Sequence, residues 1–92
     1  MAAYIAVAAT SQIGADFTMI ATDAVSLLLT DGTANPRLPR EASARIQVKN
    51  AGLKYIDIGV LNADNPMQVI SGAGVYRVIT AALAGGLGCD KT

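Results

Sequence analysis

Residues 44–60, ARIQVKNAGLKYIDIGV, hold two alternating runs on either side of a turn signal. In the first run apolar residues occupy every second position, which is typical of a half-buried antiparallel strand. The turn signal is NAG, in which Asn50 or Gly52 can supply a positive φ angle. The segment predicts a β-hairpin, and this hairpin indicates the structural class of the whole chain.

The second run of the hairpin has the same two-residue period. Because successive side chains of a strand point to opposite faces, we expect Ile56, Ile58 and Val60 to share the face toward the core. Tyr55 and Asp57 then belong to the outer face of the hairpin.

Two further runs precede the hairpin, DFTMIAT at 16–22 and AVSLLLT at 24–30. Both are dense in β-branched and large apolar residues, which predicts two strands joined tightly around Asp23. The second run also fits a short helix, but its alternation and the DG turn pair after it favour a strand. In that strand Leu28 points outward among polar neighbours.

After the hairpin, PMQVISGAGVYRVI at 66–79 predicts a strand, a glycine turn or bulge, and a returning strand. In the returning strand we expect Tyr76 and Val78 to face the core and Arg77 to face outward.

Six or seven short strands with turn signals between them, and no amphipathic helix, predict an all-β fold. We expect a small antiparallel β-sandwich or barrel with extended N- and C-terminal arms, in a single domain whose core spans residues 13–80. Residues 1–12 are expected to form an N-terminal arm or edge strand. The glycine-rich residues 81–92 are expected to be a tail that is flexible or is ordered by a partner.

The composition favours assembly with other subunits. A chain of 92 residues buries only about 60–65% of the surface that its unfolded form exposes. Hydrophobic residues make up 52% of the chain, but aromatic residues make up only 4%, and many of the others are alanine. A small core with surplus small apolar surface indicates burial against other copies.

The sequence lacks the residues that common enzyme mechanisms require. It has no histidine and one cysteine, Cys89, which excludes a Ser-His or Cys-His pair and the usual zinc sites. The glycine-rich stretches at 72–74 and 85–88 lack the Gly-Lys-Ser/Thr sequence of a phosphate-binding loop. We expect no enzymatic activity, no cofactor and no bound metal.

Charge and hydropathy argue against two classes of partner. Seven basic and seven acidic residues are spread along the chain and give a net charge of +0, so we expect no nucleic-acid partner. No run approaches the roughly 18 apolar residues of a membrane span, so we expect no membrane partner. The opening MAAYIAVAATS lacks the basic region of a signal peptide, and we expect synthesis in the cytoplasm.

The segments AVSLLLTDG at 24–32, ARIQVKNAG at 44–52 and LKYIDIGVLNADNPMQVISGAGVYRV at 53–78 together resemble a class of small virion proteins. These are the decoration (cement) proteins of tailed-bacteriophage capsids and the bases of head fibres. The resemblance covers residues 16–80 and consists of strand and turn patterns.

This resemblance implies a β-rich protein that binds the exterior of the mature capsid and stabilises the shell. It implies the major capsid protein as a partner, together with other copies of the chain, as a homotrimer or alternatively a dimer. A different class of function, a carbohydrate- or ligand-binding module of an adhesin or fibre, is the alternative. The small number of aromatic residues that could stack on a sugar argues against that alternative.

No partner-binding residue carries over from the resemblance, so the candidates come from expected exposure. The proline-rich loop at 31–42 displays two arginines that can dock on carboxylates of a partner. The candidates are Tyr4, Ile5, Leu28, Arg37, Arg40, Tyr55 and Arg77.

Overall fold

The computed structural model describes residues 2–33 and 38–92, and these residues form nine β-strands and no helix. The predicted all-β antiparallel sandwich is confirmed. The strands are β1 (Ala2–Ala8), β2 (Gln12–Ile13), β3 (Phe17–Met19), β4 (Ala24–Thr30), β5 (Ser43–Lys49), β6 (Tyr55–Asn62), β7 (Met67–Ser71), β8 (Gly74–Thr80) and β9 (Leu87–Lys91).

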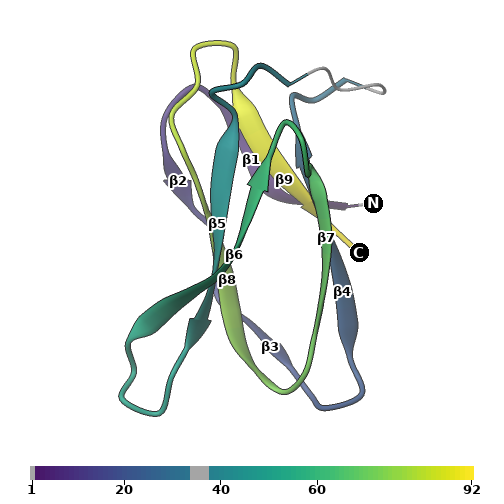
Figure 1. Cartoon of the computed structure of the whole chain (residues 1–92), viewed down its shortest axis with the longest axis vertical. Coiled ribbons are helices and arrows are strands. Elements are labelled where there is room, and N and C mark those ends of the chain that lie inside the picture. The colour runs from purple at the N-terminus through teal and green to yellow at the C-terminus, as the bar shows by residue number, and fades with distance from the viewer. Residues whose placement is uncertain (1, 34–37) are drawn as a thin grey trace.

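The strands lie in two antiparallel sheets (Figure 1). The four-stranded sheet has the order β1-β9-β4-β7. The five-stranded sheet has the order β2-β8-β5-β6, with β3 also paired to β8. Strand β6 ends one sheet and β7 ends the other. Because the chain passes directly from β6 to β7, these two edge strands lie on the same flank of the sandwich (Figure 1).

The core lies between the inner faces of the two sheets. Leu27 and Leu29 of β4 are fully buried there, as their alternation predicts. On β8, Tyr76 and Val78 face the core and Arg77 faces outward, which confirms the predicted orientation. Full burial of one such large side chain contributes about 1.5–3 kcal/mol, so each of these positions adds to the hydrophobic stabilisation.

The predicted hairpin forms from β5 and β6. The side chain of Asn50 accepts hydrogen bonds from the amides of Gly52 and Lys54 and so holds the turn together. The positive φ angle was predicted at Asn50 or Gly52, and this is wrong. It lies at Leu53, with φ of 62°.

The predicted core face of β6 is also wrong, because Ile56, Ile58 and Val60 are all 46–50% exposed. A β-bulge shifts the register of β6 against β5 between the partners of Ile46 and Gln47. One extra residue moves every later side chain to the opposite face, so Val60 lies opposite Arg45 on the outer face, whereas Ile56 precedes the bulge and lies opposite Val48. The core position at the end of β6 therefore goes to Leu61, which is fully buried.

The C-terminal segment is not a loose tail. Its strand β9 lies inside the four-stranded sheet between β1 and β4, and Leu87 and Cys89 are fully buried. Gly88 permits this, because a Cβ atom there would lie 2.5 Å from the carbonyl oxygen of Ile5. The N-terminal segment is correspondingly the edge strand β1 rather than a free arm.

The glycine turn after β7 does not make a hairpin. Strand β7 pairs with β4, whereas β8 pairs with β5 in the other sheet. Gly72, with φ of 102°, and Gly74, with φ of 157°, carry the chain from one sheet to the other. The count of nine strands exceeds the six or seven expected, because the two-residue strand β2 and the C-terminal strand β9 were not predicted.

Candidate functional site

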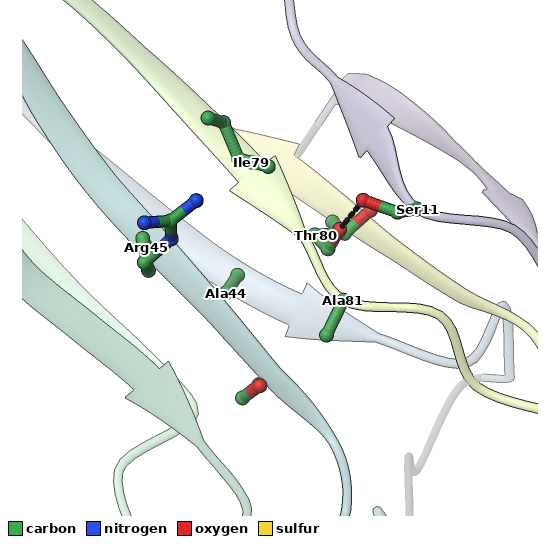
Figure 2. A pocket seen from close by; sticks show the side chains of 7 residues that line it. Ser11, Ala44, Arg45, Ile79, Thr80 and Ala81 are labelled. Carbon is green, nitrogen blue, oxygen red and sulfur yellow. Dashed lines mark hydrogen bonds between the residues drawn. The ribbon is translucent and has the colours of Figure 1, made fainter. Parts of the chain in front are cut away.

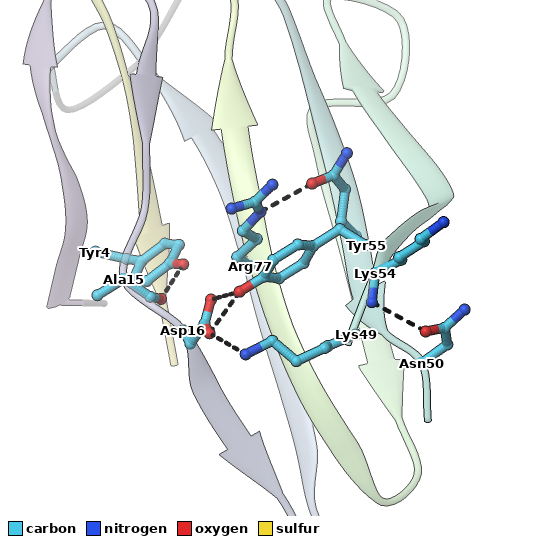
Figure 3. A network of polar contacts seen from close by, with 9 residues as sticks. Tyr4, Ala15, Asp16, Lys49, Asn50, Lys54, Tyr55 and Arg77 are labelled. Carbon is cyan, nitrogen blue, oxygen red and sulfur yellow. Dashed lines mark hydrogen bonds and ion pairs between the residues drawn. The ribbon is translucent and has the colours of Figure 1, made fainter. Parts of the chain in front are cut away.

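A network of polar contacts crosses the outer face of the five-stranded sheet (Figure 3). Tyr55 on β6 donates its hydroxyl to the carboxylate of Asp16, with O–O distances of 2.6 and 2.7 Å. Lys49 on β5 lies 3.3 Å from the same carboxylate. The guanidinium carbon of Arg77 on β8 lies 3.4 Å from the centroid of the Tyr55 ring. The tyrosine therefore links side chains from three strands and the segment before β3.

The network continues toward the edge of the sheet. Arg77 donates from Nε to the side-chain oxygen of Gln47 at 2.9 Å. Gln47 in turn donates to Asp57 at 2.7 Å, and Arg45 lies 3.5 Å from the other oxygen of that carboxylate. These contacts use donors and acceptors that a polar ligand would otherwise engage, so the face is internally cross-linked.

The titration of the network follows from these contacts. The hydrogen bond from Tyr55, aided by Lys49, lowers the pKa of Asp16. The bond to Asp16 likewise raises the pKa of Lys49. Both groups therefore stay charged at neutral pH, and neither has the pKa near 7 that suits a general acid or base.

The hollow beside β5 and β8 is small. Its volume is about 160 Å³, and Ser11 there donates a hydrogen bond to the carbonyl of Thr80 at 2.6 Å (Figure 2). Binding sites for small molecules usually enclose about 300–1,000 Å³. This hollow is therefore too small to hold such a ligand.

Two other hollows meet at the connection between β6 and β7. One of about 320 Å³ is lined by Arg40, Asn62, Ala63 and Asp64. The other, of about 110 Å³, is lined by four large or cyclic apolar residues together with Ala63. Its apolar lining residues are Leu28, Leu29, Leu38 and Pro66. Of the predicted candidates, Leu28 and Arg40 are thus brought to the same end of the molecule.

Exposed large apolar side chains are concentrated on the two edge strands β6 and β7. Among the described residues nine large apolar side chains are exposed, and five of these belong to β6 or β7. We call this set the β6–β7 flank. It consists of Ile56, Ile58, Val60, Met67 and Val69.

The opposite flank is closed by hydrogen bonds between the two sheets. Gln12 of β2, in the five-stranded sheet, donates from Nε2 to the carbonyl of Ala6 of β1, in the four-stranded sheet, at 3.0 Å. Tyr4 donates its hydroxyl to the carbonyl of Ala15, across the same boundary. On the β6–β7 flank the sheets instead meet where the side chain of Gln68 packs on Gly59, at which a Cβ atom would lie 2.9 Å from the glutamine oxygen.

The other predicted candidates are less available than expected. Ile5 is only 4% exposed and packs in the core, so its predicted exposure is wrong. Tyr4 is half-buried, with its ring edge-on to Phe17 at 5.3 Å. Tyr55 and Arg77 lie on the surface but contact each other, and Arg37 lies outside the described residues. Their roles in partner binding stay predictions.

The β6 residues of the flank were missed because alternation alone assigned Ile56, Ile58 and Val60 to the core. One available signal was charge, since no charged residue occurs from Asn65 to Tyr76. An uncharged strand is ordinarily interior, so an exposed one is conspicuous.

Comparisons with protein-family models, with curated proteins and with solved structures found no match. In residues 2–33 and 38–92, no helix is long and apolar enough to cross a membrane. The same residues contain no group of three or more His, Cys, Asp or Glu that could hold a metal ion. The functional assignment therefore depends on the surface of the chain.

Proposed function

We propose that this protein is a structural subunit that binds other protein surfaces in a larger assembly. The observation that carries the proposal is the exposed apolar β6–β7 flank, on two edge strands of different sheets. An open strand edge can pair with another chain, and exposed apolar side chains on such an edge favour a protein–protein contact.

The sequence resemblance supplies the more specific part of the proposal, in which the assembly is the mature capsid of a tailed bacteriophage. The subunit would bind the capsid exterior as a decoration protein. Binding only the mature shell stabilises that state by about 2.7 kcal/mol per site at a hundredfold excess over Kd. Repeated over many sites, this term strengthens the shell without any catalysis.

The test is the protein content of gradient-purified particles of the virus that encodes the chain. We expect the protein in a fixed ratio to the major capsid protein, and its removal should lower the temperature at which the particles release their DNA. Particles that lack the protein, and whose heat stability does not change when it is added, would refute the capsid role.

A variant pair tests the contribution of the flank. Ile58→Lys places an ammonium group on the apolar flank, and we expect it to weaken binding to stripped particles at least about tenfold. Ile13→Lys is the control, because Ile13 is 64% exposed on the opposite flank. Equal binding by both variants would show that the flank does not contact the shell.

One observation favours a second candidate function, ligand binding by a β-sandwich. The ring of Tyr55 lies on the outer sheet face with Arg77 packed against it, and aromatic rings are common platforms for sugars. The other aromatic residues are partly or fully buried in the core: Tyr4, Phe17 and Tyr76. Chemical-shift changes at Tyr55 on titration with mono- and disaccharides would support this function, and unchanged spectra would remove it.

A further inference from the structure

Strand β7 is an edge strand without the features that normally protect an edge. Within the described part of the chain it pairs only with β4, through five consecutive residue pairs and no bulge. Natural edge strands are usually blunted by charges, bulges or prolines within the strand. Strand β7 has none of these, whereas its neighbour β6 has both a bulge and Asp57.

The hydrogen bonds of β4 show which way the main chain of β7 points. The amide of Leu29 donates to the carbonyl of Pro66 at 2.7 Å, just before β7 begins. Because antiparallel pairs alternate between hydrogen-bonded and non-hydrogen-bonded, Gln68 and Ile70 direct their main-chain groups toward β4. The remaining residues direct theirs toward the open edge. These are Met67, Val69 and Ser71.

The opposite side of β4 confirms this alternation independently. Ser26 exchanges two hydrogen bonds with Thr92 beyond the end of β9, at 3.1 and 3.0 Å. Ser26 therefore points its main-chain groups toward β9, and its neighbours in β4 point theirs toward β7.

We propose that β7 pairs with β7 of a second copy, antiparallel, across a two-fold axis at Val69. This inference rests on the proposed function, because both assign the β6–β7 flank to assembly. In this register Val69 lies opposite Val69 of the other copy, and Met67 lies opposite Ser71. All of these residues direct main-chain groups to the edge, so about six hydrogen bonds join the two chains.

The same register also places compatible side chains of the two copies opposite each other. Met67 and Val69, which are 56% and 58% exposed, lie on the outer face in both copies and meet across the axis. No charged residue lies in the paired segment, so no like charges oppose each other. The pairing joins the two four-stranded sheets into one continuous sheet.

A second copy satisfies the main-chain groups of this edge, because the directions and faces of Met67, Val69 and Ser71 match themselves under the two-fold axis. A five-residue pair alone buries less than the roughly 800 Å² per partner of a standard interface. We therefore expect a weak dimer, with a Kd on the order of micromolar, that is reinforced on a larger assembly.

The test is sedimentation equilibrium of the purified chain over a range of concentrations. The mass should rise from 9.4 kDa to twice that value as concentration increases. Val69→Lys places two ammonium groups face to face at the axis and should raise the dimer Kd at least about tenfold. Ile13→Lys, an equally polar change on the other flank, should leave the Kd unchanged. A wild-type chain that is monomeric throughout, or a Val69→Lys variant that dimerises normally, overturns the proposal.

Hydrogen exchange of the unmodified chain tests the register without any variant. Amides of Met67, Val69 and Ser71 should become protected as concentration rises, while those of Gln68 and Ile70 should not change. Protection that appears on other strands instead overturns the proposed pairing. If the chain dimerises in solution but is absent from purified particles, the capsid role alone is refuted. If the chain is monomeric but binds particles, and Ile58→Lys weakens that binding, the dimer alone is refuted.

Discussion

At the scale of single residues, Leu53 holds an unfavourable backbone conformation for no evident packing benefit. Its φ is 62°, and its side chain is 75% exposed. The left-handed region costs a residue with a Cβ atom roughly 1–2 kcal/mol, and glycine avoids that cost. We expect Leu53→Gly to raise the free energy of unfolding by about 0.5–1 kcal/mol, measured by urea denaturation. Leu53→Ala keeps the Cβ atom and should give no such gain; an equal gain would refute the explanation.

A second residue, Cys89, should make the fold sensitive to alkaline pH. Burial, and then the nearby Asp90, raise the pKa of its thiol from 9.0 to about 12. Burial also raises the pKa of Tyr4 to about 12. Above pH 9.0 the thiol ionises in the unfolded chain but not in the folded one, so its contribution to stability is complete below that pH and is lost as the pH rises toward 12.

This loss is measurable as a slope. Between pH 9 and about pH 10, Cys89 alone should lower the free energy of unfolding by about 1 kcal/mol. Cys89→Ala should be less stable at neutral pH, because it leaves a cavity, but its stability should fall less steeply over this interval. Parallel slopes for the two proteins would show that the thiol is not the source.

At the scale of elements, the interior position of β9 depends on one glycine. A Cβ atom at residue 88 would lie 2.5 Å from the carbonyl oxygen of Ile5, closer than Cβ atoms approach backbone. We expect Gly88→Ala to separate β1 from β9 and to cost more than about 2 kcal/mol in chemical denaturation. Gly85→Ala is the matched control, since nothing lies within 4 Å of its Cβ position. A similar loss in both variants would show that the contact with Ile5 is not the cause, because replacing glycine by alanine lowers the entropy of the unfolded chain and by itself favours folding.

The elements that could be predicted from sequence are those with an undisturbed two-residue period. Strand β4 has this pattern, and its side chains point as expected, as do those of β8. Strand β9 has the sequence LGCDK, in which β-forming residues are scarce. It is a strand because β1 and β4 provide partners on both sides, which depends on tertiary contacts that no local pattern contains.

The candidate site was less predictable than the fold, for two physical reasons. The bulge in β6 reverses the faces that alternation assigns, so the exposed Ile58 was expected inside. Exposure of Tyr55 and Arg77 was predictable, but their mutual contact was not, because it depends on the register between β6, β5 and β8. Sequence alone therefore indicates a tendency to assemble, and the surface responsible follows from the strand order.

At the scale of the whole molecule, stability and assembly should be linked. A small sandwich with an uncovered apolar flank gains stability whenever a partner binds its native state, because the unfolded chain does not bind. At a protein concentration about tenfold above the dimer Kd this gain is roughly 1.4 kcal/mol. For a domain of this size that corresponds to a rise in melting temperature of roughly 5–10 °C.

Melting of the wild-type chain should therefore move to higher temperature with increasing protein concentration, as followed by circular dichroism. Val69→Lys should melt at one temperature across the same range, close to that of the dilute wild-type chain, because Val69 is 58% exposed and adds little to the core of a single copy. Ile13→Lys should retain the full concentration dependence. A wild-type melting temperature that does not depend on concentration would mean that the flank gives the isolated chain no stability, and that any stabilising contact is made with another protein.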